Sequence, residues 1–176
     1  MKKIAIPFLL ILLISCQSKT YYSAQSANHK RFDGWNREDA DFLMETHDLV
    51  LLIEGISSTA EDQASLKETY ILAKEIKKTT EDLRLKFKLE AAVKRVKLSS
   101  ALSEKSDQLV QKLSAISKEN FDAVYLQYLQ SNLEKSMSLA DDYIKTGHTA
   151  RLKTFANDLK NELRPLLEQI KKSDLS

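Results

Sequence analysis

The sequence predicts an all-α protein whose main domain is an antiparallel four-helix bundle, with a short extra helix before the third long helix. In four long segments, apolar residues recur at gaps of three and four, which places them on one face of each predicted helix. Only 3 glycines and 2 prolines occur among the 176 residues, and no segment alternates in the manner of a strand. Long helices joined by short connections favour packing within one chain over dimerisation as a coiled coil.

Residues 1–15 have the pattern of a secretory signal peptide that is removed from the mature protein. Lys2 and Lys3 supply its positive start, and the apolar run Ile4–Ile14 is interrupted only by Pro7. This run is shorter than the roughly 20 residues that a membrane-spanning helix needs. We therefore expect export from the cytoplasm and exclude these residues from the fold.

The segment Leu13-Ile14-Ser15-Cys16 resembles the lipobox of bacterial lipoproteins. In those proteins diacylglycerol is attached to the cysteine thiol, and cleavage leaves the acylated cysteine as the N-terminus. Cys16 is the only cysteine, so it has no disulfide partner in its own chain. The alternative is an ordinary signal peptide with an incidental cysteine. Lipidation of Cys16 predicts a membrane as partner, reached through a lipid anchor.

The residue after Cys16 indicates which membrane carries the protein. Gln17 stands there in place of Asp, which resembles the sorting pattern for the outer membrane. The expected location is therefore the cell envelope, on the outer membrane and facing the periplasm.

The charge balance argues against a nucleic-acid partner. Once Lys2 and Lys3 are removed from the 27 Lys and Arg residues, 25 remain, which equals the 25 Asp and Glu residues. Nucleic-acid binding requires a concentrated basic face. The densest basic segment, residues 84–97, is expected to be a solvated helix face, with contact to a lipid surface or an anionic polymer as the alternative.

Three further segments complete the expected domain organisation. Residues 16–38 are expected to be the acylated cysteine and a flexible tether, because they are polar and lack apolar periodicity. Residues 39–172 are expected to form the bundle, which is long enough for a core that buries about two-thirds of its unfolded surface. Residues 173–176 are expected to be a C-terminal tail.

The first long helix is predicted over Asp39–Gln63, with a deeply buried run at Leu49–Ile53. The second is predicted to start at Ser65, where Ser65 and Glu68 have the capping-box spacing, and to end near Lys94. Their apolar stripes comprise Phe42, Thr46, Leu49, Ile53, Ile56 and Ala60, and then Leu66, Tyr70, Ala73, Ile76, Thr80, Leu83 and Phe87.

Val96–Ser100 is expected to be a connection into the short extra helix. Ser117–Asn120 is predicted to cap the third long helix, which ends in front of Gly147 as a C′ glycine. Pro165 is expected to bend the fourth long helix. The inward residues of these three helices are Leu102, Leu109, Leu113 and Ile116, then Leu126, Leu129, Leu133, Met137, Ala140 and Ile144, then Leu152, Phe155, Leu159, Leu163, Leu166 and Ile170.

Several of these stretches together resemble a ferritin-like bacterial envelope family, catalogued as domain of unknown function forty-one forty-two and described as an outer-membrane protein. The most specific motif is Phe-Asp-x-x-Tyr-Leu, here Phe121, Asp122, Tyr125 and Leu126. The resemblance covers about residues 39–172 and implies a ferritin-like bundle. Its other matching stretches are Ala64-Ser65, Leu72-Ala73 with Ile76, Leu152-Lys153 with Phe155-Ala156, and Leu163–Ile170 with Pro165.

This chain departs from the family at three positions where members usually carry histidine. Those positions hold Thr80, Leu133 and Ile170, all on predicted core stripes. The Thr80 hydroxyl can bond back to its own helix backbone, and the other two side chains are hydrocarbon. A buried histidine without a partner or metal is costly. We therefore interpret the polar site implied by the resemblance as filled.

The sequence lacks the motifs of catalytic and metal-binding sites, so we expect a non-enzymatic protein without cofactors. A di-iron carboxylate bundle uses Glu-x-x-His on two helices, and no Glu-x-x-His occurs here. The three histidines, His29, His47 and His148, lie in separate predicted segments and make no metal-ligand spacing. His47, beside Asp48 and Glu45, is the sole candidate for a local metal or proton site, and we interpret it as a solvated or rim side chain.

Three functional hypotheses remain open from the sequence. The favoured one is a lipid-anchored envelope protein whose helical bundle binds a protein or cell-wall partner or has a structural role. The second is a ferritin-like metal or redox protein. The third is a carrier for an apolar molecule, held between helices loosened by Pro165 and the small residues Ala73, Ala140 and Ala156.

Overall fold

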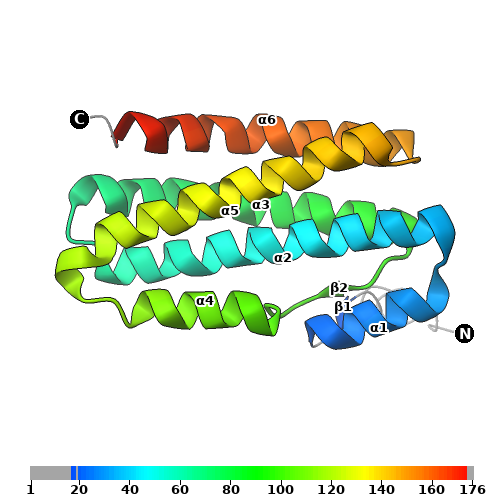
Figure 1. Ribbon diagram of the computed structural model, residues 1–176, viewed down its shortest axis with the longest axis horizontal. Coiled ribbons are helices and arrows are strands. Elements are labelled where there is room, and N and C mark those ends of the chain that lie inside the picture. Colours follow the sequence, from blue (N-terminus) through cyan, green and yellow to red (C-terminus); the bar gives the residue numbers. More distant parts are fainter. Residues whose placement is uncertain (1–16, 19, 174–176) are drawn as a thin grey trace, which may run out of the picture.

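A computed structural model describes residues 17–18 and 20–173 of the protein. The predicted signal peptide, Cys16 and residues 174–176 lie outside the described residues. The chain is all-α apart from two very short strands, and six helices pack together in the part described (Figure 1). No helix among these residues combines the length and the apolar character that crossing a membrane requires.

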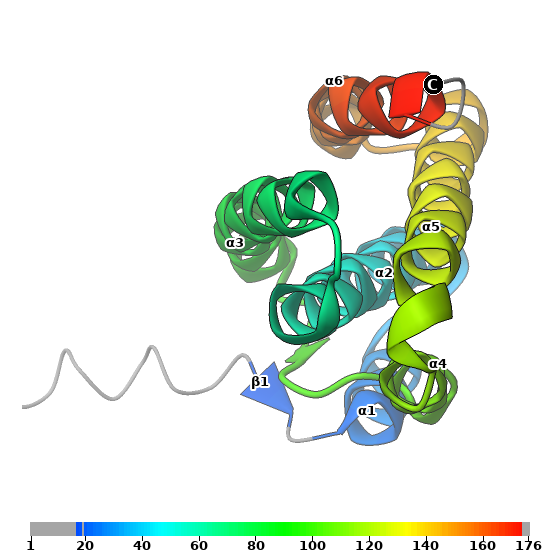
Figure 2. The same cartoon turned by 90° about the vertical axis from the view of Figure 1, so that its left-hand side faces the viewer.

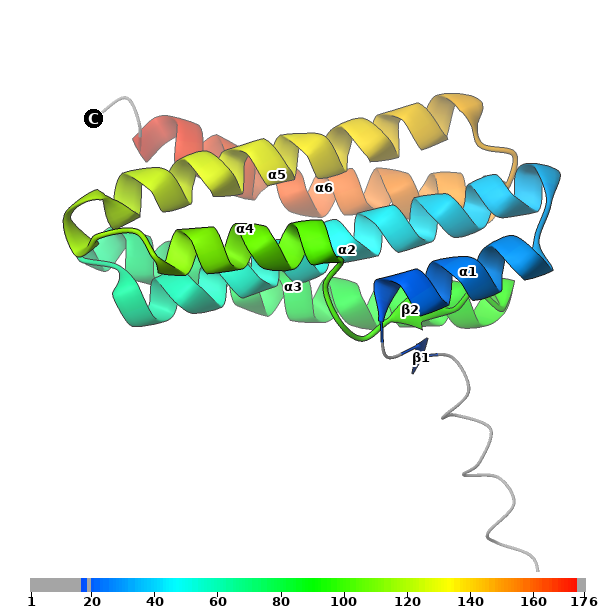
Figure 3. The same cartoon turned by 60° about the horizontal axis from the view of Figure 1, so that its bottom comes forward.

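Four long helices make up most of the fold, and two short helices pack beside them. The long helices are α2 (Gly34–Gln63), α3 (Lys67–Lys94), α5 (Lys118–Thr146) and α6 (Ala150–Ser173). The short helices are α1 (Tyr21–Arg31) and α4 (Glu104–Ser114), which lie end to end along α2 (Figure 3). Strand β1 (Gln17–Ser18) pairs in parallel with β2 (Leu98–Ser99), with Gln17 opposite Leu98.

Helix α2 is the centre of the packing. It contacts α3, α4 and α5 extensively, and α6 packs mainly on α5 (Figure 2). Helices α3 and α6 touch each other little, so one side of the four long helices is open. Because α2 is enclosed by neighbours, its run Leu49–Ile53 is buried on every side, as the sequence predicted.

Most of the remaining stripes form one apolar core, as periodicity predicted. The first two residues of the second stripe are exceptions, because Leu66 is 55% exposed and Tyr70 is 40% exposed. Leu83 and Phe87 of α3, Leu129 and Leu133 of α5, and Leu159 of α6 are all fully buried. Residues three or four apart on a helix share a face, so each stripe meets the others in the centre. Burying a side chain of this size contributes about 1.5–3 kcal/mol each.

The expected flexible tether is wrong over residues 20–38. Tyr21–Arg31 forms α1, and Thr20 and Ser23 form a capping box at its start. Asn28 is buried, its Nδ2 donates to the Lys97 carbonyl at 2.8 Å, and its Oδ1 accepts from the Lys97 backbone N–H at 2.9 Å. This helix lacks apolar periodicity because a side-chain amide, and not an apolar stripe, attaches it to the fold.

The first long helix also starts earlier than predicted. Helix α2 begins at Gly34 instead of Asp39, and Gly34 adopts the left-handed φ of 49° that suits glycine. Arg37 holds the turn that precedes it, since its guanidinium donates to the carbonyls of His29 and Phe32. The turn between α1 and α2 is therefore part of the ordered domain.

The predicted capping box at Ser65 is wrong. Helix α3 begins two residues later, and its N-cap residue, Leu66, supplies no side-chain cap. The cap comes from α5, where Asp122 Oδ2 accepts from the Ser65 N–H at 3.0 Å and Oδ1 from the Leu66 N–H at 3.3 Å. A buried carboxylate on a distant helix therefore replaces the local capping side chain.

The ends of α5 also differ from expectation. The helix begins at Lys118, and Ser117 is its N-cap residue without a side-chain cap bond. Gly147 has φ −59° and ψ 153°, so it is not the left-handed C′ glycine that was predicted. Glycine is needed there because a Cβ would lie 2.6 Å from the Tyr143 carbonyl oxygen and 2.7 Å from its ring. Helix α6 continues past Pro165 to Ser173, the first residue of the expected tail.

We predict that Asp122→Ala destabilises the protein by about 1–3 kcal/mol, because two partly buried backbone N–H groups lose their acceptor. Urea unfolding followed by circular dichroism measures this change. Asp142→Ala, at an exposed position on the same helix, is the matched control and should change stability by less than about 0.5 kcal/mol. Equal effects of the two substitutions would contradict the role assigned to Asp122.

Candidate functional site

The residues of the Phe-Asp-x-x-Tyr motif hold helices together at the start of α5. Phe121 and Tyr125 are fully buried, with ring centroids 6.2 Å apart and nearly parallel planes. The Tyr125 hydroxyl lies 3.1 Å from the Ser57 hydroxyl on α2. Burial raises the pKa of Tyr125 well above its ordinary value of 10, so the phenol stays protonated. With Asp122 capping α3, this motif joins α2, α3 and α5.

A second polar cluster, centred on Asp39, joins four segments at the opposite end of the long helices. The carboxylate of Asp39 is buried and accepts hydrogen bonds from Lys94, Tyr143 and Thr149. The Lys94 ammonium lies 2.6 Å from Asp39 Oδ2, and the Thr149 hydroxyl lies 2.5 Å from the same atom. Burial and the Asp39 carboxylate raise the pKa of Tyr143 well above its ordinary value. Every oxygen of Asp39 is therefore occupied within the fold.

Asp48 is the third buried carboxylate, and it holds the start of α4. It accepts from the Ser103 backbone N–H at 2.7 Å and from the hydroxyls of Ser103 and Ser106, each at 2.7 Å. The sequence suggested only that Asp48 stands beside His47. Its partners lie 55 and 58 residues away, so local spacing carries no sign of them.

The three histidines lie on different segments: His29 on α1, His47 on α2 and His148 in the connection between α5 and α6. His29 lies 2.8 Å from Asp41, and His148 lies 3.7 Å from Glu38. Over residues 17–18 and 20–173, no group of three or more His, Cys, Asp or Glu side chains is arranged to hold a metal ion.

The interpretation of His47 as a solvated or rim side chain is wrong. Only 3% of its surface is exposed, and its ring makes an edge contact with Phe87 at a centroid distance of 5.5 Å. Its Nε2 atom and Arg84 Nε are buried without a hydrogen-bond partner among the described residues. Burial, with a smaller contribution from Arg84 and Lys88, lowers the pKa of His47 to about 4. The ring is therefore neutral at physiological pH.

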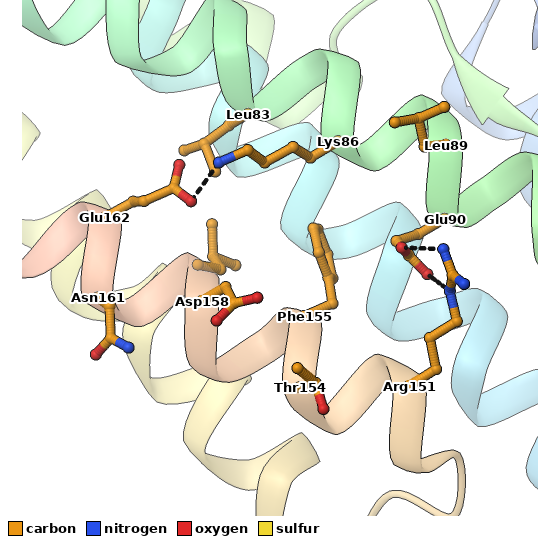
Figure 4. Close-up of a pocket in the computed structure, with 11 residues that line it drawn as sticks. Leu83, Lys86, Leu89, Glu90, Arg151, Thr154, Phe155, Asp158, Asn161 and Glu162 are labelled. Atoms are coloured by element: carbon orange, nitrogen blue, oxygen red, sulfur yellow. Dashed lines mark hydrogen bonds and ion pairs between the residues drawn. The ribbon is translucent and has the colours of Figure 1, made fainter.

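A groove of about 600 Å³ lies between α3 and α6 (Figure 4). Its floor consists of the buried side chains Leu83, Phe155 and Leu159. Two ion pairs cross it, Lys86 to Glu162 at 2.5 Å and Arg151 to Glu90 at 2.7 Å (Figure 4). Four charged side chains of the groove are therefore neutralised in pairs, whereas Asp158, which also lines it, makes no ion pair among the described residues. An apolar floor remains between them.

A smaller cleft of about 380 Å³ lies where α1, α2, α4 and α5 meet. Tyr21, Glu45, Lys105, Asn132 and Lys135 are among the side chains that line it. Burial, followed by the charge of Glu45, raises the pKa of Tyr21 to about 12, and burial also raises the pKa of Glu45. Apolar side chains such as Leu49 and Leu109 line the cleft together with these polar groups, and the Ser106 hydroxyl on its wall donates to Asp48.

Comparison with known protein families settles the relationship of the chain. Residues 23–172 match the family described as Domain of unknown function (DUF4142). The chain belongs to this family. The match includes most of α1, which agrees with an ordered helix where a tether was expected. No curated protein and no solved structure matches the chain.

In this DUF4142 protein, the three positions where the resemblance implies histidine are fully buried. Thr80 lies on α3, Leu133 on α5 and Ile170 on α6. The Thr80 hydroxyl donates to the Lys77 carbonyl at 2.8 Å, which is the backbone bond that the sequence predicted. Each position therefore contributes either hydrocarbon or a hydroxyl that is already paired.

We predict that His47 makes stability depend on pH between about pH 6.5 and pH 4. Its pKa in the folded state, about 4, lies below its ordinary value of 6.5, so the unfolded chain binds more protons in this window. Stability is present above pH 6.5 and falls as the pH drops, by about 3 kcal/mol from this group. In His47→Leu the fall between pH 7 and pH 4, measured by urea unfolding, should be smaller by that amount.

His148→Gln, at an exposed histidine, is the matched control and should leave the pH profile of stability as it is in the original protein. Identical pH profiles for the original protein and His47→Leu would contradict this prediction.

Proposed function

We propose that this DUF4142 protein is a lipid-anchored protein of the cell envelope, whose helical domain acts as a non-enzymatic binding or structural module. The observation that carries the anchor is the segment Leu13-Ile14-Ser15-Cys16, followed directly by the first described residue, Gln17. Gln17 after the cysteine supports the outer membrane, with the domain facing the periplasm.

Three buried carboxylates support a non-enzymatic role. Asp39, Asp48 and Asp122 are the buried acidic residues of the described chain, and each accepts hydrogen bonds from groups that fix helix ends. A catalytic acid or base has to face a substrate and exchange a proton with it. The oxygens of these carboxylates are occupied by groups of the protein itself, including those of Asp48, which borders the smaller cleft. We therefore assign the three carboxylates to stability and propose that function lies on the surface.

The architecture supports a ferritin-like bundle as part of this proposal. Helices α2, α3, α5 and α6 supply the four long helices, and α4 is the short extra helix before the third of them. The metal chemistry of that fold class is not part of the proposal, because Thr80, Leu133 and Ile170 occupy the positions of the family histidines. Stoichiometric iron, manganese or zinc in protein purified from cells would argue for the metal alternative.

The lipid anchor is tested by growing cells that express the full chain with labelled palmitate. The original protein should carry the label, whereas Cys16→Ser should carry none, because the only thiol of the chain is lost. Ser15→Ala, which keeps a small residue before Cys16, is the matched control and should be labelled. Equal labelling of the original protein and Cys16→Ser would refute Cys16 as the attachment site.

A second candidate function, carriage of an apolar molecule, is favoured by the groove between α3 and α6. Its volume of about 600 Å³ suits a small ligand, and its floor is apolar beneath a charged rim. This location differs from the sequence-based hypothesis, because Ala73, Ala140 and Ala156 are fully buried and line none of the hollows described above. The occupant would lie across Leu83 and Phe155.

Native mass spectrometry of protein purified from cells tests this second function. A carrier should show an added lipid-sized mass, and Thr154→Trp, which fills the groove from its rim, should remove that mass. Asn157→Trp, at an exposed position on α6 outside the groove, should retain it. A protein that carries no added mass in any of the three forms would exclude carriage.

A further inference from the structure

The outer side of α3 exposes apolar side chains that the core does not use. Of the eight large apolar residues that are exposed in the described chain, five lie on α3. Three of these, Leu85, Leu89 and Val93, lie in the second half of the helix and are 59%, 65% and 56% exposed. Their spacing of four residues places them on one side of α3, with a drift of about 40° per step.

This side of α3 lies away from its buried side. The buried residues of the same half, Leu83, Phe87 and Ala91, face the core. Leu85, Leu89 and Val93 stay exposed in the fold, and Leu89 also lines the edge of the groove between α3 and α6. All three are therefore accessible to an external partner.

The charges beside these side chains are basic. Lys88 and Arg95 are exposed next to them and have no acidic partner among the described ion pairs. Glu90 is the one acidic residue between Leu85 and Arg95, and Arg151 engages it at 2.7 Å. We call the surface formed by Leu85, Leu89, Val93, Lys88 and Arg95 the outer α3 face.

The N-terminal strand brings the membrane anchor close to the outer α3 face. Arg95 ends α3 with a left-handed φ of 56°, and β2 follows at Leu98–Ser99. Strand β1 pairs with β2 through Gln17, the residue directly after Cys16. Figure 2 shows β1 and α3 on the same side of the molecule, with α5 on the opposite side. A lipid on Cys16 would therefore reach the bilayer on the side of α3.

We propose that the outer α3 face lies on the membrane and contacts an anionic phospholipid surface. This inference rests on the proposed lipid anchor at Cys16. The aliphatic side chains would enter the interfacial region, and Lys88 and Arg95 would lie at the level of the phosphates. The acidic residues Glu81 and Asp82 are exposed on the turn before Leu85, so the contact is confined to the part of α3 from Leu85 onward.

A bilayer fits the outer α3 face better than a second copy of the chain does. A stable protein interface buries about 1,200 Å² or more in total, which exceeds what three aliphatic and two basic side chains provide. The lipid on Cys16 already holds the protein at the surface, so the face has only to orient the domain. Basic charge beside exposed aliphatic groups also complements anionic headgroups and not itself.

The test uses the full chain, acylated in cells, with Leu89→Cys. Because lipid occupies Cys16, this substitution supplies a single free thiol for an environment-sensitive nitrobenzoxadiazole probe. In vesicles of phosphatidylethanolamine and phosphatidylglycerol, the probe at residue 89 should shift to the blue and be quenched by nitroxide lipids. Ser131→Cys, exposed on α5, is the matched control and should keep the emission of a probe in water.

A second variant separates contact from mere proximity. Adding Leu85→Glu to Leu89→Cys should abolish the blue shift while acylation and the circular dichroism spectrum stay unchanged. Gln127→Glu, at an exposed position on α5, should leave the shift intact.

Three results would overturn the inference. Equal emission from probes at residues 89 and 131 would place the outer α3 face in water. A shift that appears without vesicles, or that grows with protein density, would assign the face to a second copy. Absence of lipid on Cys16 would overturn the anchor and this inference together, whereas lipid on Cys16 with a solvated probe would overturn this inference alone.

Discussion

The carboxylate of Asp39 accepts hydrogen bonds from Lys94, Tyr143 and Thr149, which come from the end of α3, the end of α5 and the α5–α6 connection. Burying the Asp39 carboxylate without these hydrogen bonds would cost much folding free energy. The four segments that meet at Asp39 are therefore held in one arrangement. Gly147 is part of the same constraint, because the absence of a side chain there leaves room for the Tyr143 ring. The packing of α2 against α3 and α5 depends on the contacts at this end of the fold.

The apolar stripes of the long helices could be predicted because their information is local. Leu83 and Phe87, four residues apart, indicate a buried face without knowledge of any other segment. Helix α1 and the cap of α3 could not be predicted, since Asn28 binds Lys97 and Asp122 binds Ser65, which are 69 and 57 residues apart. From the sequence alone, polar residues whose partners are this distant cannot be distinguished from polar residues that are exposed to solvent. The burial of His47 could not be predicted for the same reason, because its ring packs against Phe87 of another helix.

A few acidic side chains are buried in this protein, and a few large apolar side chains are exposed. Buried acids, which often mark catalytic sites, here satisfy helix ends, and the positions implied as histidine sites hold Thr80, Leu133 and Ile170. Exposed leucines, which often mark nothing, gather along one helix beside basic residues. The open side between α3 and α6, crossed by only two ion pairs in its groove, adds a second surface feature. The distribution of side chains therefore supports the proposal that function lies on the exterior of the domain and not at its centre.

The pairing of β1 with β2 has a mechanical consequence. A lipoprotein with a long flexible linker can sample the whole width of the periplasm, whereas here Gln17, directly after the proposed anchor at Cys16, is paired with Leu98 of the domain. The longest helix, α2, has 30 residues and spans about 45 Å at 1.5 Å per residue. With a lipid on Cys16, the length of the helical domain would set how far the protein extends from the bilayer. A binding partner would therefore have to lie within that distance of the bilayer.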